Sequence, residues 1–208
     1  MLFDKIKQLP ISDVFVDSKE YSLAIVITIV SFFVMVYEPV SIEWLRYQPL
    51  EISNGQWWRI FTANLSHSNW NHWMLNIAGL WLMDIFYKPV LSQKLRAALL
   101  IFCMLLNVLM LHIWLDINWY VGLSGALHGY LIGGALLSWN QAKLLNFAII
   151  FITTVKLFAE SIWQINSATE ELISANVLEE AHSFGAVSAV IFWLLWLAYT
   201  KIKKPLIY

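Results

Sequence analysis

The chain has 208 residues, of which 60% are hydrophobic and only 13% are charged, and twelve of them are tryptophans. A water-soluble domain of this length is hard to build from such a composition, so we expect an integral membrane protein. The single cysteine, Cys103, excludes a disulfide framework and a cysteine-based metal site. Residues 1–20 lack the apolar core and the small-residue cleavage site of a secretory signal, so we expect them in the mature protein.

Six segments are apolar enough to cross a membrane as helices, which takes about 20 residues each. They are Ser22 to Val40, His72 to Tyr87, Leu95 to Trp114, Gly122 to Trp139, Lys143 to Trp163 and Ala181 to Thr200. The sequence therefore predicts an all-α integral membrane protein, folded as a bundle of six transmembrane helices. The second, fourth and sixth segments are the least purely apolar.

The basic residues predict how this bundle sits in the membrane. With six spans both termini lie on one side, and most lysines and arginines fall on that side: Lys5, Lys7, Lys19, Lys88, Lys94, Arg96, Lys143, Lys201, Lys203 and Lys204. Only Arg46 and Arg59 lie in loops on the opposite side, and Lys156 lies inside the fifth span. The positive-inside rule then places both termini in the cytoplasm.

The domain organisation is simple: residues 1–208 form one membrane domain with no internal repeat. Residues 1–21 are expected to form a cytoplasmic segment before the first span. The outer loop 41–71 contains WLRY and QWWRIF, a mixture of aromatic residues and arginine that is typical of a segment lying in the headgroup region. The outer loop 164–180 is polar and acidic, and we expect a short helix or a mobile cap there.

Polar side chains recur near the outer ends of spans two, four and six. His72 and Asn76 belong to span two, Ser124 and His128 to span four, and His182 to span six. Ionisable groups inside a membrane are costly, so they are candidates for function. Three separate helices thus carry hydroxyl, imidazole and amide groups at a similar predicted depth.

Small residues at every fourth position allow membrane helices to approach closely. Span four holds Gly125, Gly129 and Gly133, and span six holds Ala181, Gly185 and Ala189. Packing these two stripes together would bring Ser124 and His182 toward a hydrogen bond of roughly 2.6 to 3.2 Å, which is the geometry of an activated serine nucleophile. A neutral histidine can accept the serine proton near pH 7.

Donors for a tetrahedral oxyanion are expected from two helices. His72 and Asn76 are four residues apart and share one helical face. The backbone N–H of Ser124, unpaired in the first turn of its helix, would add a further donor.

No acidic residue is expected to complete a triad with His182. Asp116 and Glu179 are expected in loops, and Asp84 is expected toward the cytoplasmic end. The simpler interpretation is a two-residue arrangement of serine and histidine. Lys156 and Glu160, four residues apart on span five, are interpreted as a structural or snorkelling pair.

Four motifs occur together in the expected order. They are GLSG at Gly122–Gly125, AH followed by glycine at Ala181, His182 and Gly185, WWR at Trp57–Arg59, and H-x4-H-x3-N at His67, His72 and Asn76. This combination resembles the rhomboid intramembrane serine proteases from about Arg46 to Ala198. The resemblance implies a six-helix core without a cofactor, Ser124 as nucleophile and His182 as general base. It also implies an oxyanion site formed by His72, Asn76 and the Ser124 backbone, with the loop around Trp58 and Arg59 half-embedded and the 164–180 loop capping the site.

Two positions depart from the common rhomboid pattern. His128 stands where many rhomboids have an aromatic residue such as tyrosine, and Ala189 ends the stripe where glycine is usual. The sequence SGALHG in a compact chain is similar to the rhombosortase branch. That resemblance implies a multi-pass protein of the bacterial inner membrane with its active site opening toward the periplasm. It also implies membrane-anchored protein substrates with a C-terminal Gly-Gly motif, a single transmembrane tail and basic residues, and no nucleic-acid partner.

Several alternatives stay open at this point. His128 has three available roles: stacking on His182, contacting substrate, or competing as the base. His67 lies off the face shared by His72 and Asn76, so shaping the loop is its favoured role. Two other functions compete with the protease: a rhomboid-like protein that binds membrane clients without cutting them, and a metal-dependent hydrolase with His67, His72 and His182 around zinc, although no H-E-x-x-H pair exists.

Overall fold

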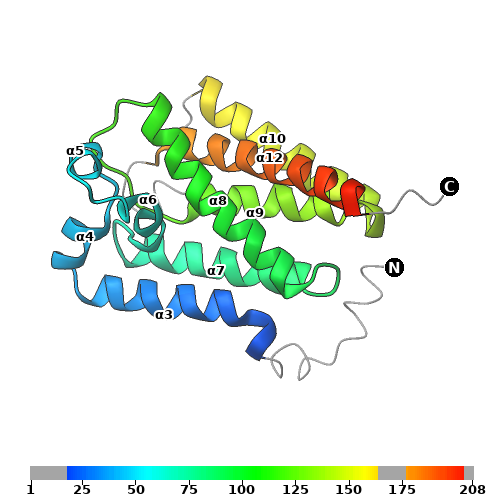
Figure 1. The fold of residues 1–208 in the computed structure, drawn as a ribbon, viewed down its shortest axis with the longest axis horizontal. Helices are drawn as coiled ribbons and strands as arrows, with labels where there is room; N and C mark the ends of the chain where they lie inside the picture. Colours follow the sequence, from blue (N-terminus) through cyan, green and yellow to red (C-terminus); the bar gives the residue numbers. More distant parts are fainter. Residues whose placement is uncertain (1–17, 164–176, 204–208) are drawn as a thin grey trace.

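The computed structural model describes residues 18–163 and 177–203, which fold into helices joined by short connections (Figure 1). The long helices are α3 (Ser22–Val36), α7 (Trp70–Tyr87), α8 (Gln93–Trp114), α9 (Ser124–Leu137), α10 (Lys143–Trp163) and α12 (Glu179–Lys203). The short ones are α4 (Val40–Leu45), α5 (Pro49–Ser53), α6 (Arg59–Thr62) and the 3-10 turns η1 (Ser18–Tyr21), η2 (Ala63–Leu65) and η3 (Trp139–Gln141). Within the described ranges the only β-type pairing is an isolated antiparallel bridge between Tyr47 and Tyr120. The all-α prediction is confirmed.

Helix α9 lies at the centre of the bundle. It packs most extensively against α12, and it also contacts α8, α10 and α7, while α3 packs on the outer side of α7. Figure 1 shows α3 beginning and α12 ending at one end of the bundle, with α4, α5 and α6 gathered at the other. Most of the buried apolar side chains form one cluster in which Leu80, Leu99, Met104 and Leu123 are almost fully enclosed.

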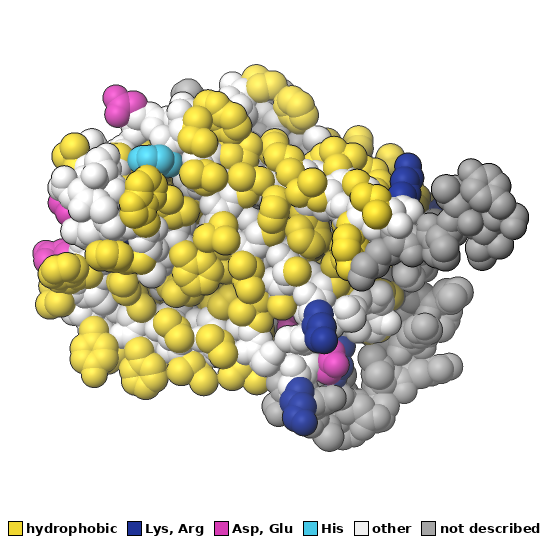
Figure 2. Space-filling view, viewed as in Figure 1, with side chains coloured by type: hydrophobic (Ala, Val, Ile, Leu, Met, Phe, Trp, Pro, Cys, Tyr) yellow, Lys and Arg dark blue, Asp and Glu magenta, His cyan; other side chains and the backbone are white. Residues whose placement is uncertain are grey.

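Within the described residues, four helical segments are long and apolar enough to cross a membrane: Lys19–Val36, Gln93–Trp114, Lys143–Ile162 and Glu179–Ile202. Helices α7 and α9 are not among them, and α9 has only 14 residues. The six-span count and the orientation of the termini therefore stay predictions. Figure 2 shows a broad hydrophobic surface between charged side chains at the two ends, as expected of a protein that lies in a bilayer.

The predicted spans and the observed helices differ at their ends. Helix α3 ends at Val36, and the chain from Val40 starts a separate short helix, α4. Helix α9 begins at Ser124 rather than at Gly122, because Gly122 has a φ of +123°, which no right-handed helix contains. The predicted cytoplasmic segment 1–21 and the predicted cap 164–180 lie mostly outside the described residues.

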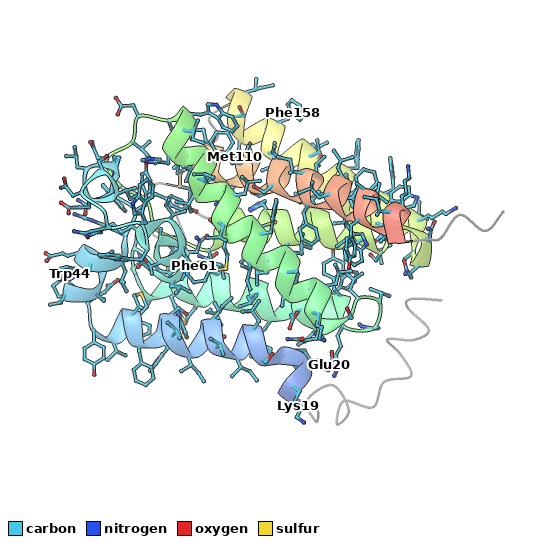
Figure 3. The ribbon with its side chains drawn as sticks, in the orientation of Figure 1. Lys19, Glu20, Trp44, Phe61, Met110 and Phe158 are labelled. Carbon is cyan, nitrogen blue, oxygen red and sulfur yellow. The ribbon has the colours of Figure 1, made fainter. Side chains whose placement is uncertain are left out.

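The outer loop 41–71 is folded around the guanidinium group of Arg59, which is only 3% exposed. Its nitrogens donate to the Glu43 and Arg46 carbonyl oxygens at 2.9 and 2.8 Å and to Gln56 Oε1 at 2.8 Å. One buried arginine thus ties α4 and α6 together. Large apolar side chains such as Trp44, labelled in Figure 3, point outward from this loop, and its place in the headgroup region stays a prediction.

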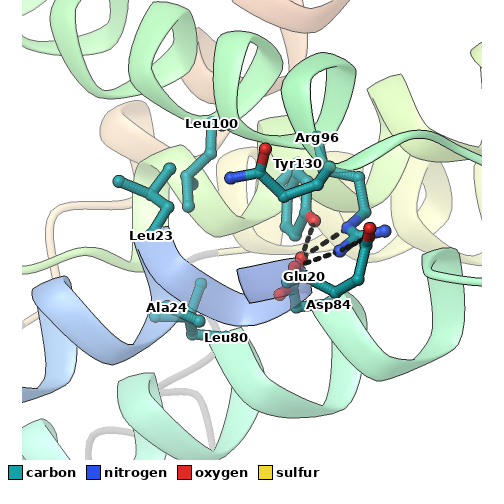
Figure 4. A pocket seen from close by; sticks show the side chains of 10 residues that line it. Glu20, Leu23, Ala24, Leu80, Asp84, Arg96, Leu100 and Tyr130 are labelled. Atoms are coloured by element: carbon teal, nitrogen blue, oxygen red, sulfur yellow. Dashed lines mark hydrogen bonds and ion pairs between the residues drawn. The ribbon is translucent and has the colours of Figure 1, made fainter. Parts of the chain in front are cut away.

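A second buried arginine, Arg96, lies in the first turn of α8, and Figure 4 shows the residues around it. Arg96 Nε donates to Asp84 Oδ1 at 2.8 Å, and the Tyr130 hydroxyl donates to the same oxygen at 2.6 Å. Arg96 also donates to the Leu91 carbonyl at 2.8 Å and forms an ion pair with Glu20 at 3.6 Å. We call Arg96, Asp84, Tyr130 and Glu20 the arginine cluster; it joins η1, α7, α8 and α9.

Candidate active site

The close contact between α9 and α12 brings Ser124 and His182 together. Ser124 Oγ lies 3.1 Å from His182 Nε2, although the two residues are 58 positions apart in the chain. His182 is buried, whereas Ser124 at the start of α9 is half-buried. A hydroxyl that donates to an unprotonated imidazole nitrogen is the arrangement that makes serine nucleophilic.

Small residues allow this approach. A Cβ added to Gly185 would lie 1.8 Å from the Gly125 carbonyl oxygen, and one added to Gly129 would lie 2.5 Å from the Gly185 carbonyl oxygen. Further along, a Cβ on Gly133 would lie 3.3 Å from Ala189 Cβ. The backbones of α9 and α12 therefore touch where larger side chains would separate them, and the Ser124–His182 distance depends on that contact.

The prediction that no acidic residue reaches His182 is wrong. Glu160 Oε2 lies 3.3 Å from His182 Nδ1, and the Glu160 side chain is only 8% exposed. The other carboxylate oxygen, Oε1, is in hydrogen-bond contact with Lys156 Nζ. The predicted pair of Lys156 and Glu160 on α10 thus exists, but it also faces the imidazole of α12. Sequence reasoning missed this because the rotation of α10 about its axis decides which neighbour Glu160 faces.

His128 stacks on His182, with ring centroids 4.1 Å apart and an interplanar angle of 22°. Its Nδ1 lies 2.8 Å from the Ser124 carbonyl oxygen, and its Nε2 lies 3.2 Å from Lys156 Nζ. A carbonyl only accepts and an ammonium only donates, so neutral His128 carries its proton on Nδ1. Both ring nitrogens are therefore engaged away from Ser124 Oγ, which favours stacking over the role of a competing base.

These contacts close into a ring of five side chains. It runs from Ser124 to His182, Glu160, Lys156 and His128 and returns to the Ser124 backbone. We call this set the serine ring; α9, α10 and α12 each contribute to it.

His72 approaches the serine from α7. The Ser68 backbone N–H points to His72 Nδ1 at 3.4 Å, and Ser68 Oγ lies 3.0 Å from the same atom. A backbone N–H can only donate, so neutral His72 carries its proton on Nε2. A Cβ added to Gly122 would lie 2.9 Å from His72 Nε2 and 3.9 Å from Ser124 Oγ. The positive φ and the close imidazole both require glycine at position 122.

Asn76 lies one turn further along α7 and is buried. Its Nδ2 atom makes no hydrogen bond to any residue that the structure describes, so this buried donor is available to a substrate.

His67 is fully buried, and its ring packs edge-on against His72 with centroids 5.0 Å apart. Burial lowers the pKa of His67 to about 3, so its ring is neutral at pH 7.

The segment before Ser124 is held by the outer loop. Tyr47 and Tyr120 exchange backbone hydrogen bonds at 3.0 and 3.2 Å, and the Gly122 N–H donates to the Ala63 carbonyl at 3.0 Å. The Tyr120 hydroxyl donates to the Gly122 carbonyl at 2.9 Å, and burial raises its pKa to about 12. Neither Ser68 nor Tyr120 was predicted as a site residue, because only the fold brings them beside His72 and Ser124.

The described residues contain no group of three or more His, Cys, Asp or Glu side chains arranged to hold a metal ion. His72 and His67 do lie together, but His182 contacts Ser124 and Glu160 instead of joining them around a common point. The zinc hypothesis from the sequence therefore lacks a donor set in this part of the chain.

Comparison with known families gives one match. The model of the Rhomboid domain family matches residues 54–199, a range that begins before α6, includes the whole serine ring and ends within α12. No curated protein matches the chain. The matched range covers more than half of the chain.

Proposed function

Because the chain belongs to the rhomboid family, whose members are generally intramembrane serine proteases, we propose that it is an endopeptidase with Ser124 as nucleophile and His182 as general base. The observation that carries this proposal is the 3.1 Å contact between Ser124 Oγ and His182 Nε2, made inside a helical membrane protein. A multi-pass bundle with its site among the helices acts on substrates that lie in the bilayer.

In the first step Ser124 Oγ attacks the carbonyl carbon of the scissile peptide bond, and His182 Nε2 accepts the hydroxyl proton. The tetrahedral intermediate collapses, the C–N bond breaks, and His182 returns the proton to the leaving amine. Water then attacks the acyl-enzyme with His182 again as base. The products are a new carboxylate and free Ser124.

The oxyanion of each tetrahedral intermediate needs donors that are already in place. We assign this role to His72 Nε2–H, Asn76 Nδ2 and the Ser124 backbone N–H. The Ser68 contact supports it, because it leaves the His72 proton on Nε2, the nitrogen that lies beside Gly122. The unused donor of Asn76 supports it as well. Preformed donors of this kind typically accelerate acyl transfer by about 10²- to 10³-fold each.

For the substrate we propose membrane-anchored proteins with a C-terminal Gly-Gly motif, a single transmembrane tail and basic residues, cleaved at the outer face of a bacterial inner membrane. The similarity of SGALHG to rhombosortases supports this class. A helical peptide bond is closed to attack, and glycines lower the cost of unwinding it. A reporter with such an anchor should be cleaved, and its Gly-Gly→Leu-Leu variant should be cleaved much more slowly.

The direct test is labelling of the purified protein in detergent with a serine-reactive fluorophosphonate. We expect labelling of the wild type at a rate unaffected by a metal chelator, and none above background for Ser124→Ala or His182→Ala. Ser138→Ala is the matched control, because Ser138 lies at the other end of α9 and donates to the Gly134 carbonyl. A Ser124→Ala protein that still labels at the wild-type rate contradicts the proposal.

The two competing functions give different results. A client-binding rhomboid-like protein would fold normally but would neither label nor cleave the reporter. A metal-dependent hydrolase would lose its activity in chelator and keep it in Ser124→Ala. The contact of Ser124 with His182 favours the protease over both.

A further inference from the structure

We propose that Glu160 is the third member of the catalytic arrangement: a positioning residue that holds His182 with its proton on Nδ1 and stabilises the imidazolium that forms during attack. This inference rests on the proposed function and changes the expected Ser–His dyad into a Ser124–His182–Glu160 triad. The observation behind it is a buried carboxylate 3.3 Å from the imidazole nitrogen that faces away from the serine.

The tautomer argument starts from Ser124. To accept the hydroxyl proton, His182 Nε2 must be unprotonated, so the single proton of the neutral ring lies on Nδ1. Glu160 Oε2 faces that nitrogen, and a carboxylate accepts the Nδ1–H. The opposite tautomer would leave two hydrogen-bond acceptors facing each other and would put a proton where the Ser124 proton must go. Glu160 therefore favours the form of His182 that can act as a base.

The electrostatic argument concerns the protonated ring. When His182 accepts the proton, a positive charge appears on a side chain that is only 5% exposed. Such a charge is costly in a low-dielectric site unless an opposite charge lies close. The Glu160 carboxylate, 8% exposed, is that charge, so it lowers the energy of the imidazolium more than that of the neutral ring.

The neighbouring groups are compatible with this role. Lys156 on α10 pairs with the same carboxylate, but its side chain is 43% exposed, so solvent screens its charge. His128 on α9 stacks on His182 as a neutral ring, and its nitrogens face Ser124 and Lys156. His72 on α7 is the other imidazole near the serine, and its Nδ1 faces Ser68. On α12 itself, Glu179 and Glu180 lie in the first turn.

If the salt bridge only stabilised helix α10, it would involve Glu160 and Lys156 alone. Here the two carboxylate oxygens are divided: Oε1 contacts Lys156 and Oε2 contacts His182. Removing Lys156 and removing the charge of Glu160 should therefore have unequal effects on catalysis, although both break the same ion pair.

The first experiment compares fluorophosphonate labelling rates of four variants with the wild type. Glu160→Gln, which keeps the shape and removes the charge, should label roughly 10²- to 10⁴-fold more slowly. Glu160→Asp should recover part of that loss. Lys156→Met should slow labelling less than about tenfold, because an exposed ion pair is weak. Glu180→Gln, the same chemical change at an exposed position two residues from His182, is the matched control and should label at the wild-type rate.

The second experiment measures the imidazole directly. In wild-type protein labelled with ¹⁵N-histidine, the His182 signals, assigned with His182→Ala, should show protonated Nδ1 and unprotonated Nε2. In Glu160→Gln the two tautomers should mix. A purely structural salt bridge would leave this signature unchanged, and the wild-type measurement holds even if Glu160→Gln does not fold.

Three results would overturn the triad. The first is a folded Glu160→Gln protein that labels at the wild-type rate, and the second is a wild-type His182 with its proton on Nε2. Either result leaves the proposed protease standing, because that depends on Ser124→Ala and His182→Ala. A Lys156→Met protein as slow as Glu160→Gln would reduce Glu160 to a partner of the lysine and would equally overturn the triad.

Discussion

The arginine cluster and the serine ring are two largely buried polar clusters on the same central helix: Ser124 begins α9, and Tyr130 lies at its middle. Both combine a carboxylate, a cation and a hydroxyl that comes from α9. In the arginine cluster the Tyr130 hydroxyl donates to the Asp84 carboxylate that also pairs with Arg96. In the serine ring the hydroxyl of Ser124 instead lies in hydrogen-bond contact with an imidazole, and the carboxylate of Glu160 contacts the other nitrogen of that imidazole.

We expect this difference to make the arginine cluster structural and the serine ring chemically reactive. A tyrosine bound to a carboxylate beside an arginine has no acceptor that can take its proton near pH 7, so the cluster only holds helices together. An imidazole between a hydroxyl and a carboxylate can take that proton and return it. Substitutions in the arginine cluster should therefore change the stability of the fold, and substitutions in the serine ring should change the rate of labelling and cleavage.

Asp84→Asn should give the largest change in stability. It removes the closer and more deeply buried of the two carboxylates that pair with Arg96, and breaking a buried pair costs about 3–5 kcal/mol. Unfolding of the purified protein by SDS measures the loss, and fluorophosphonate labelling per folded molecule should stay at the wild-type rate. An Asp84→Asn protein of normal stability but low reactivity would reverse the roles of the two groups.

Asn76→Ala should have the largest effect on rate outside the serine ring. Loss of one oxyanion donor typically costs about 2.7–4 kcal/mol in the transition state, a decrease of about 10²- to 10³-fold. Stability should hardly change, because Asn76 Nδ2 makes no hydrogen bond within the described chain. Cleavage of the Gly-Gly reporter gives the rate. Asn146→Ala serves as the control: Asn146 donates to the Ser138 carbonyl at 2.7 Å, so its loss should lower stability and leave the rate unchanged.

Tyr130→Phe tests the comparison within a single helix. It removes the hydrogen bond to the Asp84 carboxylate, and hydrogen bonds to charged groups are worth about 1.5–3 kcal/mol. The SDS unfolding midpoint should fall, while Ser124 on the same helix should label at the wild-type rate. Slower labelling by the folded variant would mean that the two groups are coupled along α9.

His128→Phe should have the smallest effect. Phenylalanine keeps a ring to stack on His182 and removes only the contacts with the Ser124 carbonyl and Lys156. We expect labelling to slow by less than about tenfold, because neither nitrogen of His128 faces the serine hydroxyl. Loss of all labelling in a folded protein would make His128 part of the proton transfer.

Much of the fold follows from the sequence because long apolar runs and small-residue stripes act locally. The observed ends of α7, α8 and α10 lie within two residues of the predicted ones. Helix α3 is shorter than predicted because the chain turns before Pro39, which the hydrophobic pattern does not record. The membrane crossing of α7 and α9 stays a prediction, since one is interrupted by polar residues and the other is short.

In the candidate active site, too, some residues could be predicted from the sequence and others could not. Motifs and stripes indicated Ser124 and His182, because both follow from spacing within single helices. Glu160 was assigned only to Lys156, since the i, i+4 rule describes one helix and does not predict which helix lies opposite. The sequence did contain one indication of a role for Glu160. Placing an acidic residue inside an apolar span costs free energy, so such a residue is a candidate for function. Ser68 carries no comparable signal, because a serine in a loop is common.

The length of α9 has a consequence for where the protein would cut. Fourteen residues of α-helix extend about 21 Å, whereas the hydrocarbon core of a bilayer is about 30 Å thick. If the C-terminal end of α9 lies level with one edge of that core, the Ser124 end stops about 9 Å short of the other edge. The length of α9 would then set the depth in the bilayer at which the scissile bond must lie. Lipids with longer acyl chains should lower the cleavage rate in vesicles without altering fluorophosphonate labelling in detergent.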